Sequence, residues 1–60
     1  MKNLLYTFKI ENKKGSIIFT TTTCDEETAL FIASTLLFEG YFPIKSPAYI
    51  RYMGATDYDC

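Results

Sequence analysis

The sequence predicts an α+β domain in which a small antiparallel sheet carries one helix packed on a face. Two observations support this fold class. Alternating apolar and polar residues, typical of half-buried strands, fill the early part of the chain and recur near its C-terminus. A longer segment between them has apolar residues at helical spacing. The predicted order is ββαβ(β), an N-terminal hairpin plus one or two C-terminal strands, in a single domain over residues 1–54.

The N-terminal hairpin consists of two predicted strands, residues 4–11 and residues 16–23. The first strand shows the alternation, and the second is rich in β-branched residues, which favour strands. Between them, residues 12–15 predict a type I turn, in which Asn12 suits the first position and Gly15 supplies a left-handed residue. We therefore expect the two strands to pair antiparallel.

The length of the turn sets which residues of the two strands lie opposite each other. If residues 12–15 form the loop, Ile10 faces Ile17 and Phe8 faces Phe19, so apolar side chains share one face. A bulged loop would shift the pairing by one residue and place Ile10 opposite Ile18. We expect the first register, because it places apolar side chains beside each other.

The predicted helix begins at a capping box and ends at a glycine. Thr23 is expected as the N-cap, with Glu26 three residues later to complete the box. The consecutive acidic residues from position 25 to position 27 are also favoured in the first turn by the helix dipole. The helix is expected to run to about Glu39, with Gly40 in the left-handed C-terminal cap.

The C-terminal part of the chain contains one or two further predicted strands. Residues 41–44 resemble a short strand, but Pro43 lacks an N–H for the ladder, which restricts them to an edge or makes them irregular. Residues 48–53 alternate again and predict a final strand, which Gly54 is expected to end. We expect residues 55–60 to form a flexible acidic tail.

The predicted helix is apolar on two opposite sides when it is projected at about 100° per residue. The broader side is expected to cover the sheet, and it consists of Ala29, Leu30, Ile32, Ala33, Leu36 and Leu37. Phe31 and Phe38 lie together on the opposite side. Their neighbours there are Glu27, Ser34 and Thr35. The small hydroxyl side chains would permit the close approach of another surface.

The second apolar side, Phe31 and Phe38, predicts contact with a partner. A chain of 60 residues buries only about 60% of its unfolded surface, which leaves few elements to cover these rings. We expect a symmetric homodimer through the helix first, and a groove on a larger protein second. A dimer joined at a sheet edge beside Pro43 would also present the helices outward. The alternative is cover from within, by residues 48–53 or by the tail.

Composition argues against several classes of function. The chain has no His and two Cys, too few ligands for a structural zinc site, and no catalytic or phosphate-binding motif. We therefore expect no enzyme activity, no metal or other cofactor and no small-molecule substrate. No segment approaches the ~20 apolar residues of a membrane span, and the N-terminal residues lack the apolar core of a signal peptide. Cytoplasm is the expected location.

The cysteines, Cys24 and Cys60, leave alternatives open. One disulfide between them is possible, but we expect a reduced chain with Cys24 as a buried apolar filler and Cys60 on the tail. A thiol-redox function is a further alternative, because a thiol near a helix N-terminus has a lowered pKa. The acidic residues beside Cys24 would oppose its thiolate form.

Nucleic-acid binding is the main alternative function. Lysines gather at the hairpin tip, and two tyrosines that could stack on bases flank an arginine near the C-terminus. The residues that would carry this function are Lys9, Lys13, Lys14, Arg51, Tyr49 and Tyr52, to which Lys2 and Lys45 could add. The net charge of −1 gives little general attraction for phosphates, so we expect a solvated hairpin tip instead.

These observations favour a non-enzymatic protein-interaction module. We expect the chain to self-associate and to modulate or inhibit a larger protein by occupying its surface. In size and in its lack of catalytic groups, the chain resembles the small inhibitors that phages and other mobile elements encode against host or defence machinery. The resemblance is one of general character, and it implies a protein target.

Overall fold

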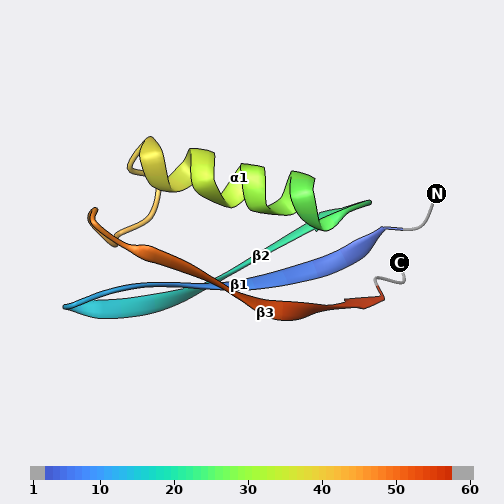
Figure 1. The fold of residues 1–60 in the computed structure, drawn as a ribbon, viewed down its shortest axis with the longest axis horizontal. Coiled ribbons are helices and arrows are strands. Elements are labelled where there is room, and N and C mark those ends of the chain that lie inside the picture. Colours follow the sequence, from blue (N-terminus) through green and yellow to red (C-terminus); the bar gives the residue numbers. More distant parts are fainter. Residues whose placement is uncertain (1–2, 58–60) are drawn as a thin grey trace.

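The computed structural model describes residues 3–57, which form one three-stranded sheet and one helix (Figure 1). The elements are β1 (Leu4–Asn12), β2 (Gly15–Thr23), α1 (Glu26–Phe38) and β3 (Tyr49–Asp57). The strand pairs are antiparallel, the order across the sheet is β2-β1-β3, and α1 lies over one face (Figure 1). The predicted α+β fold is therefore confirmed, in the order ββαβ.

Within residues 3–57, β3 is the only strand that follows the helix. Residues 41–44 form a loop, so the prediction of a short strand there is wrong. Pro43 has no backbone N–H to give to a ladder. Phe42 is instead buried in the core, with the centre of its ring 5.1 Å from that of Phe19. The loop therefore contributes to the core and not to the sheet.

The N-terminal hairpin has the predicted register. Ile10 lies opposite Ile17 and Phe8 lies opposite Phe19, so the alternative pairing of Ile10 with Ile18 is wrong. The other side of β1 pairs with β3, which makes β1 the central strand. Its alternation therefore decides which residues of the sheet face the helix.

Asn12 closes the hairpin turn with its side chain. Its Oδ1 accepts hydrogen bonds from the backbone N–H groups of Lys14, at 2.8 Å, and Gly15, at 3.0 Å. The expectation of a left-handed Gly15 is wrong, because the positive φ angles of residues 3–57 are at Gly40 and Gly54. The Asn12 side chain satisfies the Gly15 N–H, so the turn closes without a left-handed residue.

The N-cap of α1 is Asp25, and the prediction that Thr23 caps the helix is wrong. Asp25 has extended backbone angles, φ −152° and ψ 159°, and its Oδ1 accepts the backbone N–H of Thr28 at 2.6 Å. Thr23 is instead the last residue of β2, where it pairs with Leu4. Strand pairing therefore holds Thr23 in the sheet, and Asp25, whose side chain is the more favoured N-cap, takes its place.

The C-terminal end of α1 has the predicted glycine cap. The helix ends at Phe38, and Gly40 adopts a left-handed φ of 78°. The Gly40 N–H donates to the Leu37 carbonyl oxygen at 3.2 Å. The Tyr41 N–H donates to the Leu36 carbonyl oxygen at 3.0 Å. This pair of bonds is a Schellman motif, which satisfies carbonyl groups that a helix end leaves unpaired.

Strand β3 continues past Gly54, so the prediction that Gly54 ends the strand is wrong. Tyr52 lies opposite Phe8 and Gly54 lies opposite Thr7, which leaves Met53 as an extra residue on β3. Gly54 has a φ of 132°, which L-residues rarely adopt. The glycine therefore belongs to a β-bulge, after which the ladder resumes.

The bulge changes the extent of the sheet. Residues 55–57, expected at the start of a flexible tail, lie in β3 and pair with β1. The rest of that expected tail, residues 58–60, lies outside the described residues. The sheet therefore extends past the predicted domain boundary at residue 54.

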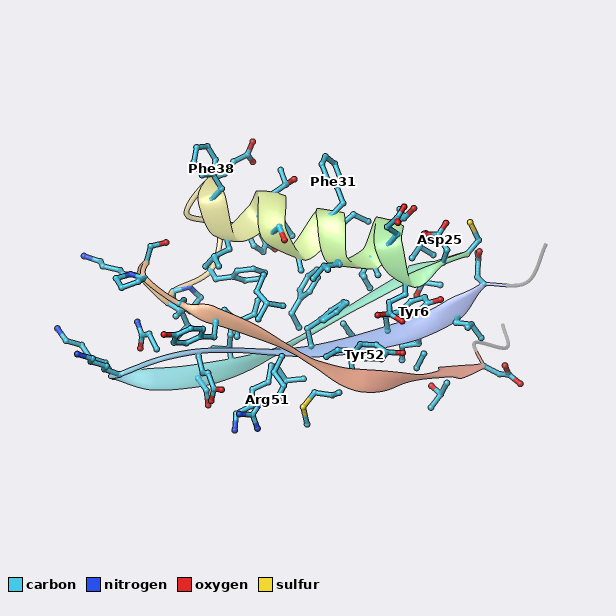
Figure 2. The ribbon with its side chains drawn as sticks, viewed as in Figure 1. Tyr6, Asp25, Phe31, Phe38, Arg51 and Tyr52 are labelled. Carbon is cyan, nitrogen blue, oxygen red and sulfur yellow. The ribbon has the colours of Figure 1, made fainter. Side chains whose placement is uncertain are left out.

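The core lies between α1 and the face of the sheet that it covers (Figure 2). Its buried residues are Tyr6, Phe8, Ile10, Ala29, Ala33 and Phe42. The two alanines of α1 have short side chains, which let the helix backbone lie close to the aromatic residues of β1. Each strand residue of this core alternates with one that points to the open face of the sheet, the side away from α1.

The apolar stripe predicted to cover the sheet is only partly buried. Ala29 and Ala33 are fully buried, and a half-buried group consists of Ile32, Leu36 and Leu37. Leu30 is 42% exposed, so it covers the sheet less fully than predicted. It lies at the margin of the stripe, where the surface of the helix curves away from the sheet.

Candidate protein-binding face of the helix

Phe31 and Phe38 project from the side of α1 that faces away from the sheet (Figure 2). Phe31 is 70% exposed and Phe38 is 90% exposed, whereas Phe8 in the core is 1% exposed. The C-terminal strand, which was the alternative source of cover from within, lies in the sheet beside β1. Cover from within is therefore not found among residues 3–57.

We define the outer helix face as Glu27, Leu30, Phe31, Ser34 and Phe38, which are all exposed. They follow the spacing of three and four residues that aligns side chains along one side of a helix. Leu30 widens the apolar surface beyond the predicted phenylalanine pair. Thr35, which was expected on this face, is half-buried and lies at its margin.

Tyr41 adds an exposed aromatic side chain just beyond the C-terminal end of α1. Its side chain is exposed, and its ring lies edge-on to that of Phe42, with the ring centres 5.5 Å apart. The left-handed Gly40 turns the chain at this point. Sequence reasoning missed this placement of Tyr41, because it expected residues 41–44 to be a strand. The most exposed phenylalanine, Phe38, therefore has a second aromatic residue near it in the chain.

The border of the outer helix face is acidic. Glu26 and Glu27 lie in the first turn, Glu39 follows the last turn, and α1 itself contains no Lys or Arg. The backbone N–H of Thr28 donates to the Asp25 carboxylate and holds the pKa of this N-cap below its ordinary value. Asp25 is therefore ionised at neutral pH and adds to the negative charge at this end of the helix.

Positive charge gathers at the other end of the molecule, around the hairpin tip. Lys13 and Lys14 of the turn and Lys45 of the loop after α1 line a concavity of about 690 Å³. The Asn12 Nδ2 group donates to the Lys45 carbonyl oxygen at 2.9 Å and holds the loop against the hairpin. Tyr49, which is exposed, also lines the concavity. We call this site the basic concavity.

The other predicted nucleic-acid-binding residues do not share one face. Arg51 points away from the helix (Figure 2) and lies opposite Lys9 across the β1–β3 ladder. Glu11 contacts both cations: its Oε2 lies 3.4 Å from Arg51 Nη2, and its Oε1 lies 3.9 Å from Lys9 Nζ. Tyr52 lies on the helix side, with its ring centre 5.7 Å from that of Phe8. Glu11 therefore offsets part of the positive charge on the open face of the sheet.

Cys24 lies in the connection between β2 and α1 and is exposed, so the expectation of a buried cysteine is wrong. Its Sγ donates a hydrogen bond to Oδ2 of Asp25 at 3.5 Å. The connection places Asp25 at the helix end, and this leaves the adjacent thiol in solvent. Cys60, the other cysteine, lies outside the described residues.

A comparison with protein-family models, with curated proteins and with solved structures found no match. In the described range, 3–57, no helix is both long enough and apolar enough to cross a membrane. The same range contains no group of three or more His, Cys, Asp or Glu side chains that could hold a metal ion. What the protein does must therefore be inferred from its own surfaces.

Proposed function

We propose that the chain is a non-enzymatic protein-binding module whose outer helix face docks into an apolar groove of a larger protein. The observation that carries this proposal is the exposure of Phe31 and Phe38 on a helix whose other side already covers the core. Rings at i and i+7 of one helix are typical anchors for a groove. Burial of a phenylalanine side chain contributes about 1.5–3 kcal/mol. The two rings together would supply roughly half of the 8 kcal/mol of a micromolar complex.

The acidic border favours a groove with a basic rim over a second copy of the same helix. Carboxylates lie at both ends of the face, Glu26 and Glu27 at one end and Glu39 at the other. A two-fold contact between identical helices would bring like charges together in either direction. Lys or Arg residues around a groove would instead pair with these carboxylates. The helix-to-helix homodimer is therefore not the arrangement that we propose for this face.

Binding is proposed to modulate or inhibit the target by occupying its groove. A chain of 6.9 kDa can fill a groove and exclude the helix or segment that the target normally binds there. The proposed setting is the cytoplasm, a reducing compartment in which the Cys24 side chain would remain a thiol. No chemistry on the target is needed for this effect.

A photo-crosslinking amino acid in place of Ser34, between the two rings, tests the proposal in cells. It is expected to capture one defined protein. The same group in place of Thr56, an exposed residue of β3, is the matched control and is expected not to capture that protein. Equal capture from both positions would contradict the proposal.

Titration of the captured protein with purified chain then measures the contribution of the rings. Phe31→Asp plus Phe38→Asp should weaken binding at least about 100-fold, because the rings can no longer leave water. Tyr49→Asp plus Thr56→Asp adds the same charge on β3 and should leave the affinity unchanged. Circular dichroism of both variants should match the wild type, since all four side chains are exposed. Unchanged affinity of the phenylalanine variant would overturn the proposal.

The basic concavity favours a second candidate function, binding of a single-stranded nucleic acid. Its lysines are Lys13, Lys14 and Lys45. They would neutralise phosphates, and Tyr49 would stack on a base. The two cations beside Glu11 would contribute less, because that carboxylate contacts both. The concavity is thus the part of the surface that best supports this alternative.

Affinity for a labelled single-stranded oligonucleotide, measured against salt concentration, tests this second function. Neutralisation of three phosphates gives a slope of about −2 in a plot of log K against log salt. Replacement of the three lysines by alanine should remove both the affinity and the slope. The phenylalanine variant is the control and should bind as the wild type does. A wild-type chain that does not bind at low salt would exclude this function.

A further inference from the structure

Strand β2 is an outer edge of the sheet without the features that usually protect an edge. Among residues 3–57 it pairs with β1 alone, so its outer side is open to another strand. Natural proteins block such edges with charged side chains, proline, bulges or very short strands. β2 spans nine residues, GSIIFTTTT, with no charge and no proline, and its pairing with β1 is regular throughout.

The opposite edge, β3, carries such protection. Met53 and Gly54 form the bulge, which interrupts the regular spacing of its backbone groups. Arg51 places a charge on the same strand (Figure 2). Both edge strands are nine residues long, so the difference between them is chemical and not one of length. The structure therefore leaves β2 as the edge that can accept a strand.

Side chains along β2 suit a neighbouring strand. Ile18 is 59% exposed on the open face of the sheet, and Thr20 and Thr22 are exposed beside it. Threonine is favoured in strands, and it forms hydrogen bonds with threonine or serine across strands. A second strand here would cover part of the Ile18 surface that its own chain leaves exposed.

The two ends of β2 carry opposite charges. Lys13 and Lys14 immediately precede the strand, and the acidic residues Asp25, Glu26 and Glu27 follow it. An antiparallel second copy would place the two lysines beside the partner's acidic residues, once at each end of the new ladder. A parallel copy would place like charges together. The edge is therefore complementary to itself in the antiparallel orientation.

We propose that β2 pairs antiparallel with β2 of a second copy of the chain, which joins the two sheets into one continuous sheet. Full overlap places Gly15 opposite the partner's Thr23 and Ile18 opposite the partner's Thr20. The two-fold axis between antiparallel neighbours in one sheet is perpendicular to that sheet, so both helices lie on the same side. The dimer presents two outer helix faces in one direction, and it forms whether or not they bind a target.

Sedimentation equilibrium tests the dimer directly. The full chain should give a mass near twice 6.9 kDa. The edge variant, Ile18→Lys plus Thr20→Lys, sets like charges opposite each other across the new ladder and should give the mass of a single chain. Its fold should be retained, because both side chains are exposed in the single chain. Tyr49→Lys plus Thr56→Lys on β3 is the matched control and should remain dimeric.

Charge exchange at the ends of β2 tests the antiparallel orientation. Lys13→Glu plus Lys14→Glu makes both ends acidic, so this variant alone should be monomeric. Glu26→Lys plus Glu27→Lys makes both ends predominantly basic, and this variant alone should also be monomeric. An equimolar mixture restores opposite charges at both ends and should form a one-to-one heterodimer. Introducing Ile18→Lys plus Thr20→Lys into both components should abolish that heterodimer. General charge attraction between the chains would not explain this loss, so it would assign the contact to the β2 edge.

Three results would overturn the proposal. One is a wild-type chain that stays monomeric at submillimolar concentration, and another is a dimer that survives in the edge variant. The third is loss of the dimer in Phe31→Asp plus Phe38→Asp, which would assign the contact to the outer helix face. If that phenylalanine variant stays dimeric and keeps its affinity for the captured protein, only the proposed function fails. The two proposals are therefore distinguishable in the same set of variants.

Discussion

The Asn12 side chain donates from Nδ2 to the backbone carbonyl oxygen of Lys45 over 2.9 Å, and this bond joins the hairpin tip to a loop 33 residues later. The Oδ1 atom of the same carboxamide accepts the N–H groups of Lys14 and Gly15. One side chain therefore closes the β1–β2 turn and positions the loop that follows the helix. It also holds together the two segments that line the basic concavity.

Substitution of Asn12 should separate these two roles. Asn12→Asp keeps an acceptor for the turn but removes the donor to Lys45, and it should lower the free energy of unfolding by about 0.5–1.5 kcal/mol. Asn12→Ala removes both contacts and should lower it further. Urea denaturation measures both values. An Asn12→Asp variant as stable as the wild type would show that the contact with Lys45 contributes nothing.

Gly54→Ala should lower the free energy of unfolding by about 1–3 kcal/mol, through backbone strain at the bulge. Gly54 has a φ of 132°, although no heavy atom lies within 4 Å of the place that a Cβ would take, so the cost is not a clash. Gly15 has equally open surroundings without a positive φ, which makes Gly15→Ala the matched control. That variant should be neutral or up to about 1 kcal/mol more stable. Chemical denaturation measures the free energy of unfolding of both variants. Equal changes in Gly54→Ala and Gly15→Ala would contradict the bulge geometry.

Phenylalanine positions should differ sharply in their contribution to stability. Phe8→Ala should cost about 3–5 kcal/mol, because it opens a cavity at a residue that is 1% exposed. Such a loss is comparable to the whole stability of a small domain, so Phe8→Leu gives a milder variant that can still be measured. Phe31→Ala should stay within about 0.5 kcal/mol of the wild type, since its ring is already in water. A large loss in Phe31→Ala would show that residues outside the described range cover this ring.

Low pH should destabilise the N-terminal end of α1, because the Asp25 carboxylate that caps it becomes protonated. Thr28 lowers the pKa of Asp25 in the folded chain below its ordinary value of 3.8. The stabilisation by the carboxylate is therefore complete above that value and is lost as the pH falls through the folded pKa. Asp25→Asn keeps a capping oxygen but does not titrate. Thermal unfolding should be measured from about pH 6 to pH 2. The wild type should lose stability relative to Asp25→Asn only as the pH approaches and falls below the ordinary pKa of 3.8. A difference that is constant with pH would contradict this assignment.

Much of the fold follows from signals that lie within a few residues of one another. The alternation of residues 4–11 and the length of the turn predict the observed hairpin register. Helical spacing places Phe31 and Phe38 on one side, and Gly40 marks the end of the helix. Such patterns can be read from sequence because the backbone period alone decides which side chains share a face. The same period also places Arg51 and Tyr52 on opposite faces, which argues against a single nucleic-acid surface.

Other features depend on segments that are distant in the chain. Thr23 and Asp25 are both good helix caps, and the pairing of Thr23 with Leu4 decides between them. Gly54 suits both the end of a strand and a bulge, and the continued pairing of β3 with β1 selects the bulge. Phe42 becomes a core residue because it meets Phe19. At each of these sites the local sequence is compatible with more than one conformation. Contact with a segment distant in the chain selects the one that is observed.

By itself, the sequence determined the element order, the hairpin register, the helix and the outward direction of its two phenylalanines. Only the tertiary structure decided that no part of the chain from residue 3 to residue 57 covers those rings, that Leu30 is exposed beside them, and that β2 is an open, uncharged edge within this range. The direction of a side chain follows from local backbone geometry. Its burial, and the exposure of a strand edge, depend on where the rest of the chain lies.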